Sequence, residues 1–232
     1  MAELYLIRHG QASFGAEDYD RLSGLGEKQC LLLGKHVARF TDRIKLVTGS
    51  HLRHHQSKDA FLSGLGQGRQ NVESLLEMPE FNEFDHEEVL FKAYPEIKSK
   101  KDLAMIISQA DVPKKAFHLM FQASVERWIS GHFEDDYKEP WLAFQQRCIA
   151  GLDALIAENS GSAPVFLFTS GGPISVILKH VMALSDKATF ALNDNLANSG
   201  ITRLLYSNER ISPSYINNFS HLEHDNKLIS YR

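Results

Sequence analysis

The feature that most constrains this fold is a repeated order of short apolar run, polar loop and helix-like segment. The first run, ELYLI at residues 3–7, stops at the charged residues Arg8 and His9, as a buried strand ends in a loop. Runs at residues 44–47 and 165–169 end in the same way. This alternation predicts an α/β fold, with a mostly parallel, mixed central sheet and helices on both faces. In such sheets, ligands gather at the carboxyl ends of the strands.

Segments with apolar residues at helical spacing follow these runs. Leu25 to Phe40 is one such segment, and Ser23 stands in front of it as a candidate N-cap. Pro140 suits the first turn of a later helix that begins near Trp141. The other expected elements are a helix towards Leu65, a helix from about Ile174 to Ala183, and strands at 201–206 and 214–218.

The length of 232 residues is enough for one large domain with its own core. Because no internal repeat or long Pro/Gly/Ser linker interrupts the chain, we expect a single domain over residues 1–232. The charge-rich stretch at about 87–136 has the pattern of amphipathic helices and is the candidate insertion. Such helices can form a lid over a site, or they can simply pack on the domain.

Composition excludes some classes of partner. The net charge of −4 gives no overall basic field for nucleic acid or an anionic membrane, so neither is expected as a partner. The N-terminus MAELYLIRHG has no basic region before a long apolar run, and no stretch approaches the roughly 18 apolar residues of a membrane span. We therefore expect a cytoplasmic protein. Cys30 and Cys148 are too few for a disulfide framework and are expected to be reduced core residues.

The tripeptide Arg8-His9-Gly10 places a cation beside an imidazole on a turn, where glycine allows a close backbone approach to a ligand. This combination suits a phosphate group. A neutral imidazole can attack phosphorus and form phosphohistidine, provided that its other ring nitrogen is held by an acceptor. Taken alone, the tripeptide is more often a structural surface loop, so the chemistry depends on other parts of the sequence.

Several further segments occur in a meaningful order. LIRHGQASFG is followed by DYDRLSGLGEKQ, TGSHLRHHQS and FNEFD, and then by WLAFQQR, FLFTSGGPI, ANSGIT and HLEHDNKLISYR. Together they resemble the histidine phosphatase superfamily, also called phosphoglycerate mutase-like or RHG proteins. The resemblance spans most of the chain, and the insertion is its least diagnostic part.

The resemblance implies roles for four residues. His9 would be the phosphate-accepting nucleophile, and Arg8 and Arg53 would clamp the phosphoryl oxygens, a task for which the guanidinium fork is suited. Glu83 in FNEFD matches the proton donor of the family, which protonates the leaving oxygen and then deprotonates the attacking water. The implied enzyme is a histidine-type phosphatase that needs no cofactor and no metal.

One position departs from the family pattern. After the buried strand at residues 165–169, the family usually has a second histidine in a sequence such as S-H-G-G, whereas this chain has Ser170. A serine donates one hydrogen bond, and the amides of Gly171 and Gly172 can add anion contacts at a helix start. It supplies no cation. The protein is therefore expected to be a working phosphatase, with a weakly active or non-catalytic phospholigand-binding protein as the alternative.

Substrate choice would come from the mouth of the site. Gln11 and Ser13 are candidate substrate-binding residues, and Phe14 and the insertion at about 87–136 are expected to shape specificity. Cofactor-dependent mutases of the superfamily usually follow RHG with a string of the type QSxWN, whereas this chain has QASFG, which favours hydrolysis over mutase action. The expected partner is a small phosphorylated metabolite or another phosphomonoester. The sequence does not specify the substrate or the oligomeric state.

A metal site near Arg53 is the competing interpretation of that loop. His51 and His55 are four residues apart, so they can share one face of a helix. No glutamate stands between them as in zinc proteases, and histidines on a loop or helix surface are the more ordinary explanation. No metal is therefore predicted.

Overall fold

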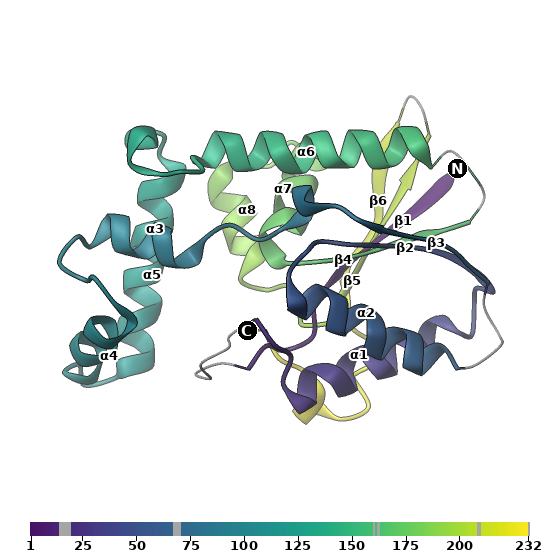
Figure 1. Ribbon diagram of the computed structural model, residues 1–232, viewed down its shortest axis with the longest axis horizontal. Coiled ribbons are helices and arrows are strands. Elements are labelled where there is room, and N and C mark those ends of the chain that lie inside the picture. Colours follow the sequence, from purple (N-terminus) through teal and green to yellow (C-terminus); the bar gives the residue numbers. More distant parts are fainter. Residues whose placement is uncertain (14–19, 67–70, 160, 162, 208–209, 232) are drawn as a thin grey trace. The chain divides into compact units, whose positions relative to one another are not determined.

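The computed structural model describes residues 1–13, 20–66, 71–159, 161, 163–207 and 210–231. The chain forms two compact units (Figure 1). The first contains residues 1–83 and 147–232, and the second contains residues 84–146. The longest helix, α6 (Trp141–Glu158), begins in the second unit and ends in the first.

The first unit is built on a mixed sheet. Its described strands are β1 (Ala2–Arg8), β2 (Arg43–Thr48), β3 (Asn71–Glu77), β4 (Val165–Thr169), β5 (Ile201–Tyr206) and β6 (Ile211–Asn218). They form one six-stranded sheet in the order β3-β2-β4-β1-β5-β6. β3, β2, β4 and β1 pair in parallel, whereas β5 is antiparallel to both of its neighbours. This confirms the predicted α/β class with a mostly parallel sheet.

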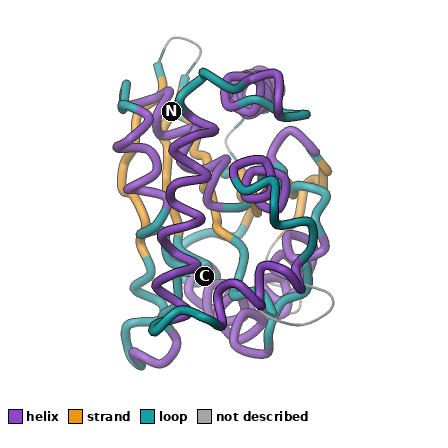
Figure 2. Tube along the Cα trace, turned by 90° about the vertical axis from the view of Figure 1, so that its left-hand side faces the viewer, coloured by secondary structure: helices purple, strands orange, loops and turns teal. Residues whose placement is uncertain are grey.

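Helices cover both faces of this sheet. Those of the first unit are α1 (Gly24–Val37), α2 (Leu52–Leu65), α7 (Gly171–Met182), α8 (Asp186–Asn193) and the later part of α6. Figure 2 shows the strands in orange beside the purple helices. In the described part of the chain, no helix is both long and apolar enough to cross a lipid bilayer.

The alternation of side chains along β1 and β4 creates two cores. Leu4 and Leu6 point to the face where α6 and α7 pack, together with Leu167 from β4. Tyr5 points to the opposite face, where α1 and α2 pack, and its ring stacks on Phe166 at 4.5 Å. Both strands are therefore buried on both faces, which explains why they form nearly continuous apolar runs in the sequence.

One helix end follows its predicted capping residue, and another differs from the prediction. The Ser23 hydroxyl accepts a hydrogen bond from the Gly26 N–H at 3.1 Å, which confirms it as the N-cap of α1. The helix expected from about Ile174 starts three residues earlier, at Gly171. The sequence Gly-Gly-Pro looks like a loop, but Pro173 is compatible with the first turn because the N–H groups there have no partner within the helix.

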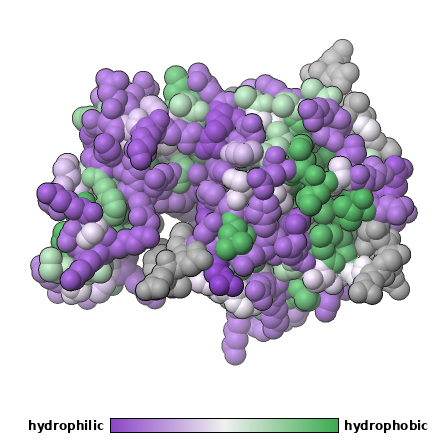
Figure 3. Space-filling model, viewed as in Figure 1, coloured by the Kyte–Doolittle hydropathy of each residue, from purple (hydrophilic) through white to green (hydrophobic). Residues whose placement is uncertain are grey.

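One strand and one α-helix of the first unit were absent from the predictions. The edge strand β3 has the sequence NVESLLE, which lacks a regular alternation of apolar and polar residues, and its side chains are exposed. Figure 3 shows hydrophobic surface near this edge of the sheet, where Val72, Leu75 and Leu76 are exposed. α8 is short, and its N-cap Ser185 accepts a hydrogen bond from the Ala188 N–H. Neither segment had a hydrophobic period strong enough to reveal it.

The second unit is helical. It contains α3 (His86–Ala93), α4 (Lys100–Ser108), α5 (Pro113–Ile129) and the first residues of α6. Its centre is an aromatic cluster in which Trp128 stacks on Phe84 at 4.7 Å and meets Trp141 edge-on at 5.1 Å. A role as a mobile lid stays a prediction.

The two cysteines lie in the first unit. Cys30 in α1 and Cys148 in α6 are both fully buried thiols outside any disulfide. Burial raises the pKa of the Cys30 thiol to about 12, so it stays protonated and behaves as a small apolar side chain.

His221, a buried histidine that follows β6, makes the stability of the fold depend on pH. His221 is only 7% exposed, and its Nε2 lies 2.8 Å from the Ser199 hydroxyl oxygen. Burial, and to a lesser degree the neighbouring His36 and His224, lowers its pKa to about 3. The unfolded chain begins to protonate His221 near pH 6.5. In the folded protein the ring is still neutral at that pH.

The contrast between central and edge strands gives a first prediction. Phe166→Ala in β4 should lower the free energy of unfolding by about 3 to 5 kcal/mol, because the Phe166 side chain is fully buried and its removal leaves a cavity in the core. Leu75→Ala in β3 should cost less than about 1 kcal/mol, because that side chain is already 58% exposed. Urea unfolding followed by circular dichroism measures both. Equal losses would contradict the assignment of β3 as an exposed edge.

The burial of His221 predicts acid sensitivity. Between the ordinary histidine pKa of 6.5 and the folded value of about 3, the unfolded chain binds a proton that the folded protein excludes. The contribution of His221 to the free energy of unfolding is therefore complete above pH 6.5. It decreases by about 1.4 kcal/mol per pH unit below that pH. His221→Gln should make the slope of unfolding free energy against pH shallower by that amount between pH 6 and 4.5. The exposed His132→Gln is the control, and an unchanged slope in the His221 variant would refute the argument.

Candidate active site

The ends of β1 and β4 bring the two central loops together. In the parallel pairing, Arg8 stands opposite Thr169, and the His9 N–H donates to the Thr169 carbonyl at 2.8 Å. The chain leaves both strands at the same edge of the sheet, so His9 and Ser170 begin adjacent loops. This is the edge at which the sequence predicted a ligand site.

The His9 ring is held in one orientation. Its Nδ1 lies 2.7 Å from the Gly10 carbonyl oxygen, which can only accept, so Nδ1 carries the proton and Nε2 carries a lone pair. Burial lowers the pKa of His9 well below its ordinary value, and the guanidinium groups of Arg53 and Arg8 lower it further. The ring is thus a neutral imidazole whose Nε2 can act as a nucleophile.

A serine joins the His9 loop to α2. The Gly10 N–H donates to the Ser57 hydroxyl at 3.0 Å, and that hydroxyl donates to the Arg53 carbonyl at 2.7 Å. The absence of a side chain at Gly10 also allows a close approach, but the neighbour is the backbone of α1: a Cβ there would lie 2.4 Å from the Gly26 carbonyl oxygen. The glycine thus allows the packing of α1 against the loop, and the ligand contact expected from the sequence stays a prediction.

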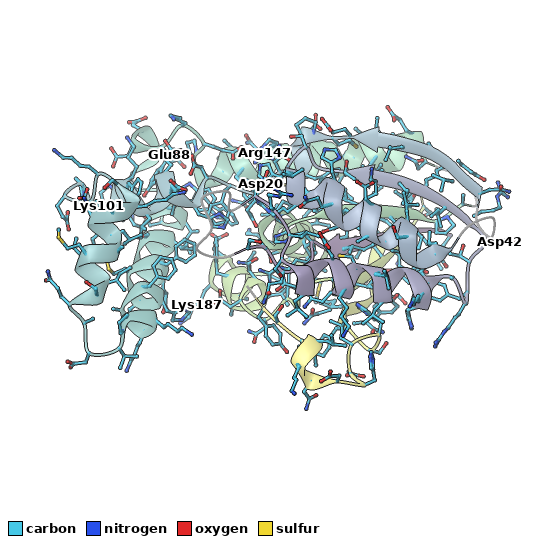
Figure 4. The ribbon with its side chains drawn as sticks, turned by 60° about the horizontal axis from the view of Figure 1, so that its bottom comes forward. Asp20, Asp42, Glu88, Lys101, Arg147 and Lys187 are labelled. Atoms are coloured by element: carbon cyan, nitrogen blue, oxygen red, sulfur yellow. The ribbon has the colours of Figure 1, made fainter. Side chains whose placement is uncertain are left out.

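Arg53 projects from the first turn of α2 and is 7% exposed. Its Nη1 pairs with Asp20 Oδ1 at 2.6 Å, and its Nη2 lies 3.5 Å from the Ser170 hydroxyl oxygen. Asp20 Oδ2 accepts from the Leu52 N–H at 2.8 Å and so caps α2, whose N-cap residue His51 makes no capping hydrogen bond with its side chain. In Figure 4, Asp20 lies at the opposite end of the first unit from Asp42, which precedes β2.

Arg8 reaches two backbone carbonyls of the C-terminal part of the chain. Its Nη1 donates to the Leu196 carbonyl and, at 3.0 Å, to the Tyr231 carbonyl. A Cβ added to Gly171 would lie 3.8 Å from its Nε, so the guanidinium passes close to the start of α7. The two anchors orient Arg8 on the other side of the strand ends from α2.

Glu83 lies at the N-terminus of α7. Its Oε2 accepts a hydrogen bond from the Gly172 N–H at 3.1 Å, two residues beyond Ser170. This amide was expected to be available to an anion, but the structure gives it to the carboxylate. A negative charge here is stabilised by the positive end of the helix dipole.

The chain before Glu83 is held by two side chains of the first unit. Arg147 Nη1 donates to the carbonyls of Pro79, Glu80 and Asn82 at 3.1, 2.8 and 3.1 Å. Thr169 Oγ1 donates to the Phe81 carbonyl at 2.6 Å. Figure 4 labels Arg147, which comes from α6. The Glu83 backbone is thus tied to the end of β4, the strand that precedes Ser170.

The candidate residues for specificity take up local roles. Gln11 Oε1 accepts from the Ser23 hydroxyl at 2.9 Å, so this side chain supports the cap of α1. The Ser13 hydroxyl donates to the Leu22 carbonyl at 3.1 Å. Gly171 is the first residue of α7. Phe14 lies outside the described residues. Contacts of Gln11 and Ser13 with a substrate stay predictions.

Several residues near the site were missed as participants. Ser57 and His54 belong to TGSHLRHHQS but had no role assigned at a phosphate site, and Arg147 was noted in WLAFQQR without a role. His54 is fully buried, its Nε2 lies 2.7 Å from the Ser170 hydroxyl oxygen, and its ring centre is 6.0 Å from that of His9. The signal that could have found His54 is its place in the helix, next to Arg53, which was expected to face the site.

The histidines of this loop do not gather around one point. His55 Nε2 pairs with Glu77 Oε2 at 2.9 Å on the surface, whereas the His51 ring stacks on that of His54 at 5.2 Å. Among the residues that the structure describes, no group of three or more histidine, cysteine or acidic side chains could hold a metal ion.

Comparison with known proteins identifies the family. The family model described as histidine phosphatase superfamily (branch 1) matches residues 4–218. No curated protein matches the chain.

Solved structures share the fold at low sequence identity. Phosphoglycerate mutase from Bacillus anthracis is 16% identical, with a TM-score of 0.64, over 96% of this chain and 95% of that one. Phosphoserine phosphatase from Entamoeba histolytica is 15% identical, with a TM-score of 0.62, over 96% and 100%. Mycobacterial glucosyl-3-phosphoglycerate phosphatase is 16% identical, with a TM-score of 0.61, over 94% and 99%.

The family match covers nearly the whole chain, and the phosphoglycerate mutase-like fold extends over the length of each neighbour. The central sheet and the sequence order of its elements agree with both results. The chain therefore belongs to the histidine phosphatase superfamily.

Proposed function

We propose that the protein is a phosphomonoester hydrolase that acts through a phosphohistidine on His9. The observation that carries the proposal is the state of the His9 ring: it is buried, it is neutral, and its Nδ1 is bound to the Gly10 carbonyl, so Nε2 is the nucleophilic atom. Two guanidinium groups close enough to lower its pKa would bind the phosphoryl oxygens. Neighbours of the same fold that are named as phosphatases support this proposal.

In the first step, His9 Nε2 attacks phosphorus and the bond to the ester oxygen breaks. Glu83, in its protonated form, would give its proton to the departing alcohol. The ring becomes positively charged when its nitrogen binds phosphorus, and the negative phosphoryl oxygens offset that charge. Arg8 and Arg53 stabilise the charge that spreads over those oxygens in the transition state.

In the second step, water replaces His9 on phosphorus. The Glu83 carboxylate left by the first step would take a proton from the attacking water, and the phosphorus–nitrogen bond breaks. Inorganic phosphate and a neutral His9 result, so the cycle closes without a cofactor. The bond from Gly172 would keep the Glu83 carboxyl group at the start of α7 through both steps.

The ion pair between Arg53 and Asp20 bears on substrate binding. A phosphate dianion that takes both outer nitrogens of Arg53 would compete with Asp20 for Nη1, which now lies 2.6 Å from Oδ1. Phosphomonoesters carry this charge at neutral pH. We therefore propose a small phosphorylated metabolite or another phosphomonoester as the substrate.

The first test is release of phosphate from an aryl phosphate in the presence of a chelator. His9→Ala should lower the rate by at least about 1000-fold, because no other group supplies the nucleophile. The wild type, quenched during turnover, should carry phosphate that is labile in acid and stable in base. His55→Ala, a surface change in α2, is the matched control and should keep its rate.

Full activity in the His9 variant would contradict the proposed mechanism. Transfer of phosphate between sugar acids, stimulated by a bisphosphorylated sugar acid and faster than hydrolysis, would instead identify a mutase. Binding of phosphate esters without any release would identify a binding protein.

Arg147 gives a second test, of how Glu83 is positioned. Arg147→Met removes the bonds to three carbonyls ahead of Glu83, so the carboxyl group should lose its alignment. We expect kcat to fall by about 10- to 100-fold. Binding of inorganic phosphate, measured by calorimetry, should not change because the clamp is intact. The exposed Arg39→Met is the control. A weaker phosphate affinity with unchanged kcat would show that Arg147 acts on the clamp instead.

A further inference from the structure

His54 and Ser170 form a buried pair beside His9. The two residues are 116 positions apart in sequence, yet His54 Nε2 lies 2.7 Å from the Ser170 hydroxyl oxygen. Both are fully buried, and the His54 ring centre is 6.0 Å from that of His9. A short contact between two enclosed polar groups, next to a nucleophile, requires a physical explanation.

The surroundings of His54 determine which nitrogen carries its proton. In the described part of the chain, its buried Nδ1 has no hydrogen-bond partner. That nitrogen faces the backbone of Gly49 so closely that a Cβ there would lie 2.4 Å away. An N–H in this position would be a buried donor without an acceptor, which costs more than an unused lone pair. The proton therefore belongs on Nε2, and the Nε2–H donates to Ser170.

This tautomer determines what Ser170 can do. Its hydroxyl oxygen accepts from His54 and, at 3.5 Å, faces the Arg53 Nη2 donor as well. With donors on both sides of the oxygen, the hydroxyl hydrogen is left to be donated. An oxygen bound by Arg53 Nη2 would be within reach of that hydrogen, and the clamp proposed above places a phosphoryl oxygen there.

We propose that His54 is a positioning residue that orients the Ser170 hydroxyl as a hydrogen-bond donor to the transferring phosphoryl group. The inference rests on the proposed phosphatase function and adds two residues to it. Ser170 touches the substrate, whereas His54 acts only through Ser170. The pair supplies an oriented hydrogen-bond donor at the start of α7. It stands at the position where the family usually has a histidine and this chain has the uncharged Ser170.

The opposite direction of proton transfer would make Ser170 a nucleophile and His54 its base. It requires the proton on Nδ1, where the structure offers no acceptor among the described residues. It also requires a positive His54 ring next to Arg53, although burial and the charge of Arg53 both lower the pKa of His54 well below its ordinary value.

The experiment compares variants that separate the hydrogen bond from packing. His54→Leu fills similar volume without a donor, whereas His54→Gln keeps an N–H donor at similar reach. Ser170→Ala should lower phosphate release by about 100-fold, and His54→Leu by about 10-fold or more. His54→Gln should stay within about fivefold of the wild type. The double variant that combines His54→Leu with Ser170→Ala should be no slower than Ser170→Ala alone, because both changes remove one shared contact. His55→Ala is the control on the same helix.

A second readout does not depend on turnover. The dissociation constant for inorganic phosphate, measured by calorimetry, should rise by about 10-fold or more in Ser170→Ala and in His54→Leu. It should change little in His54→Gln and His55→Ala. Thermal unfolding of each variant establishes that it is folded under the assay conditions.

The outcomes distinguish this inference from the proposed function. If the wild type releases no phosphate but these two variants bind phosphate more weakly, the enzymatic function fails and the paired donor stands. If the wild type is active, His9→Ala is inactive, and His54→Leu matches the wild type in both readouts, the inference is wrong and the function stands. Losses in His54→Gln equal to those in His54→Leu would also overturn it, and so would an acid-stable phosphate on Ser170.

Discussion

The parallel pairing of β1 with β4 determines where every part of the candidate site can stand. The hydrogen bond from His9 to Thr169 extends the ladder one residue beyond the register of the two strands. As a result, the two loops leave the sheet side by side. Ser57 then joins α2 to the first loop, and Glu83 binds the first turn of α7 after the second. Residues from four distant stretches of the chain meet because they are all attached to one pair of buried strands.

The candidate site combines positive charge with a neutral imidazole. A charged imidazole would have to be buried beside two guanidinium groups, and both burial and repulsion disfavour it. The same arrangement favours an anion, whose negative charge the guanidinium groups can share. Asp20, which also caps the start of α2, offsets part of the charge of Arg53. The electrostatics that hold His9 neutral are thus the electrostatics that suit a phosphate ester.

The sequence could predict those features of the fold that depend on patterns of neighbouring residues. The buried strands, the Ser23 cap and the order of strand, loop and helix were predicted correctly, because apolar runs and capping residues act within a few positions. The exposed edge strand β3 was missed because its partner β2, rather than its own pattern, makes it a strand. The fold class and the family could therefore be predicted, whereas the roles of His9, Arg53 and Glu83 remain proposals.

The contacts that position the site could not be predicted, since they join residues far apart in sequence. Ser170 taken alone is a weak substitute for a cationic side chain, and the linear sequence offered no reason to connect it with His54. Consecutive residues of a helix point about 100° apart, so the first turn of α2 can direct Arg53 to one side of Ser170 and His54 to another. One helix start then supplies both Arg53, which we propose binds phosphate, and the partner of the serine. A substitution at one position of a family motif, such as Ser170, should for this reason be judged together with the side chains that surround it. A neighbouring element can supply the missing hydrogen bond.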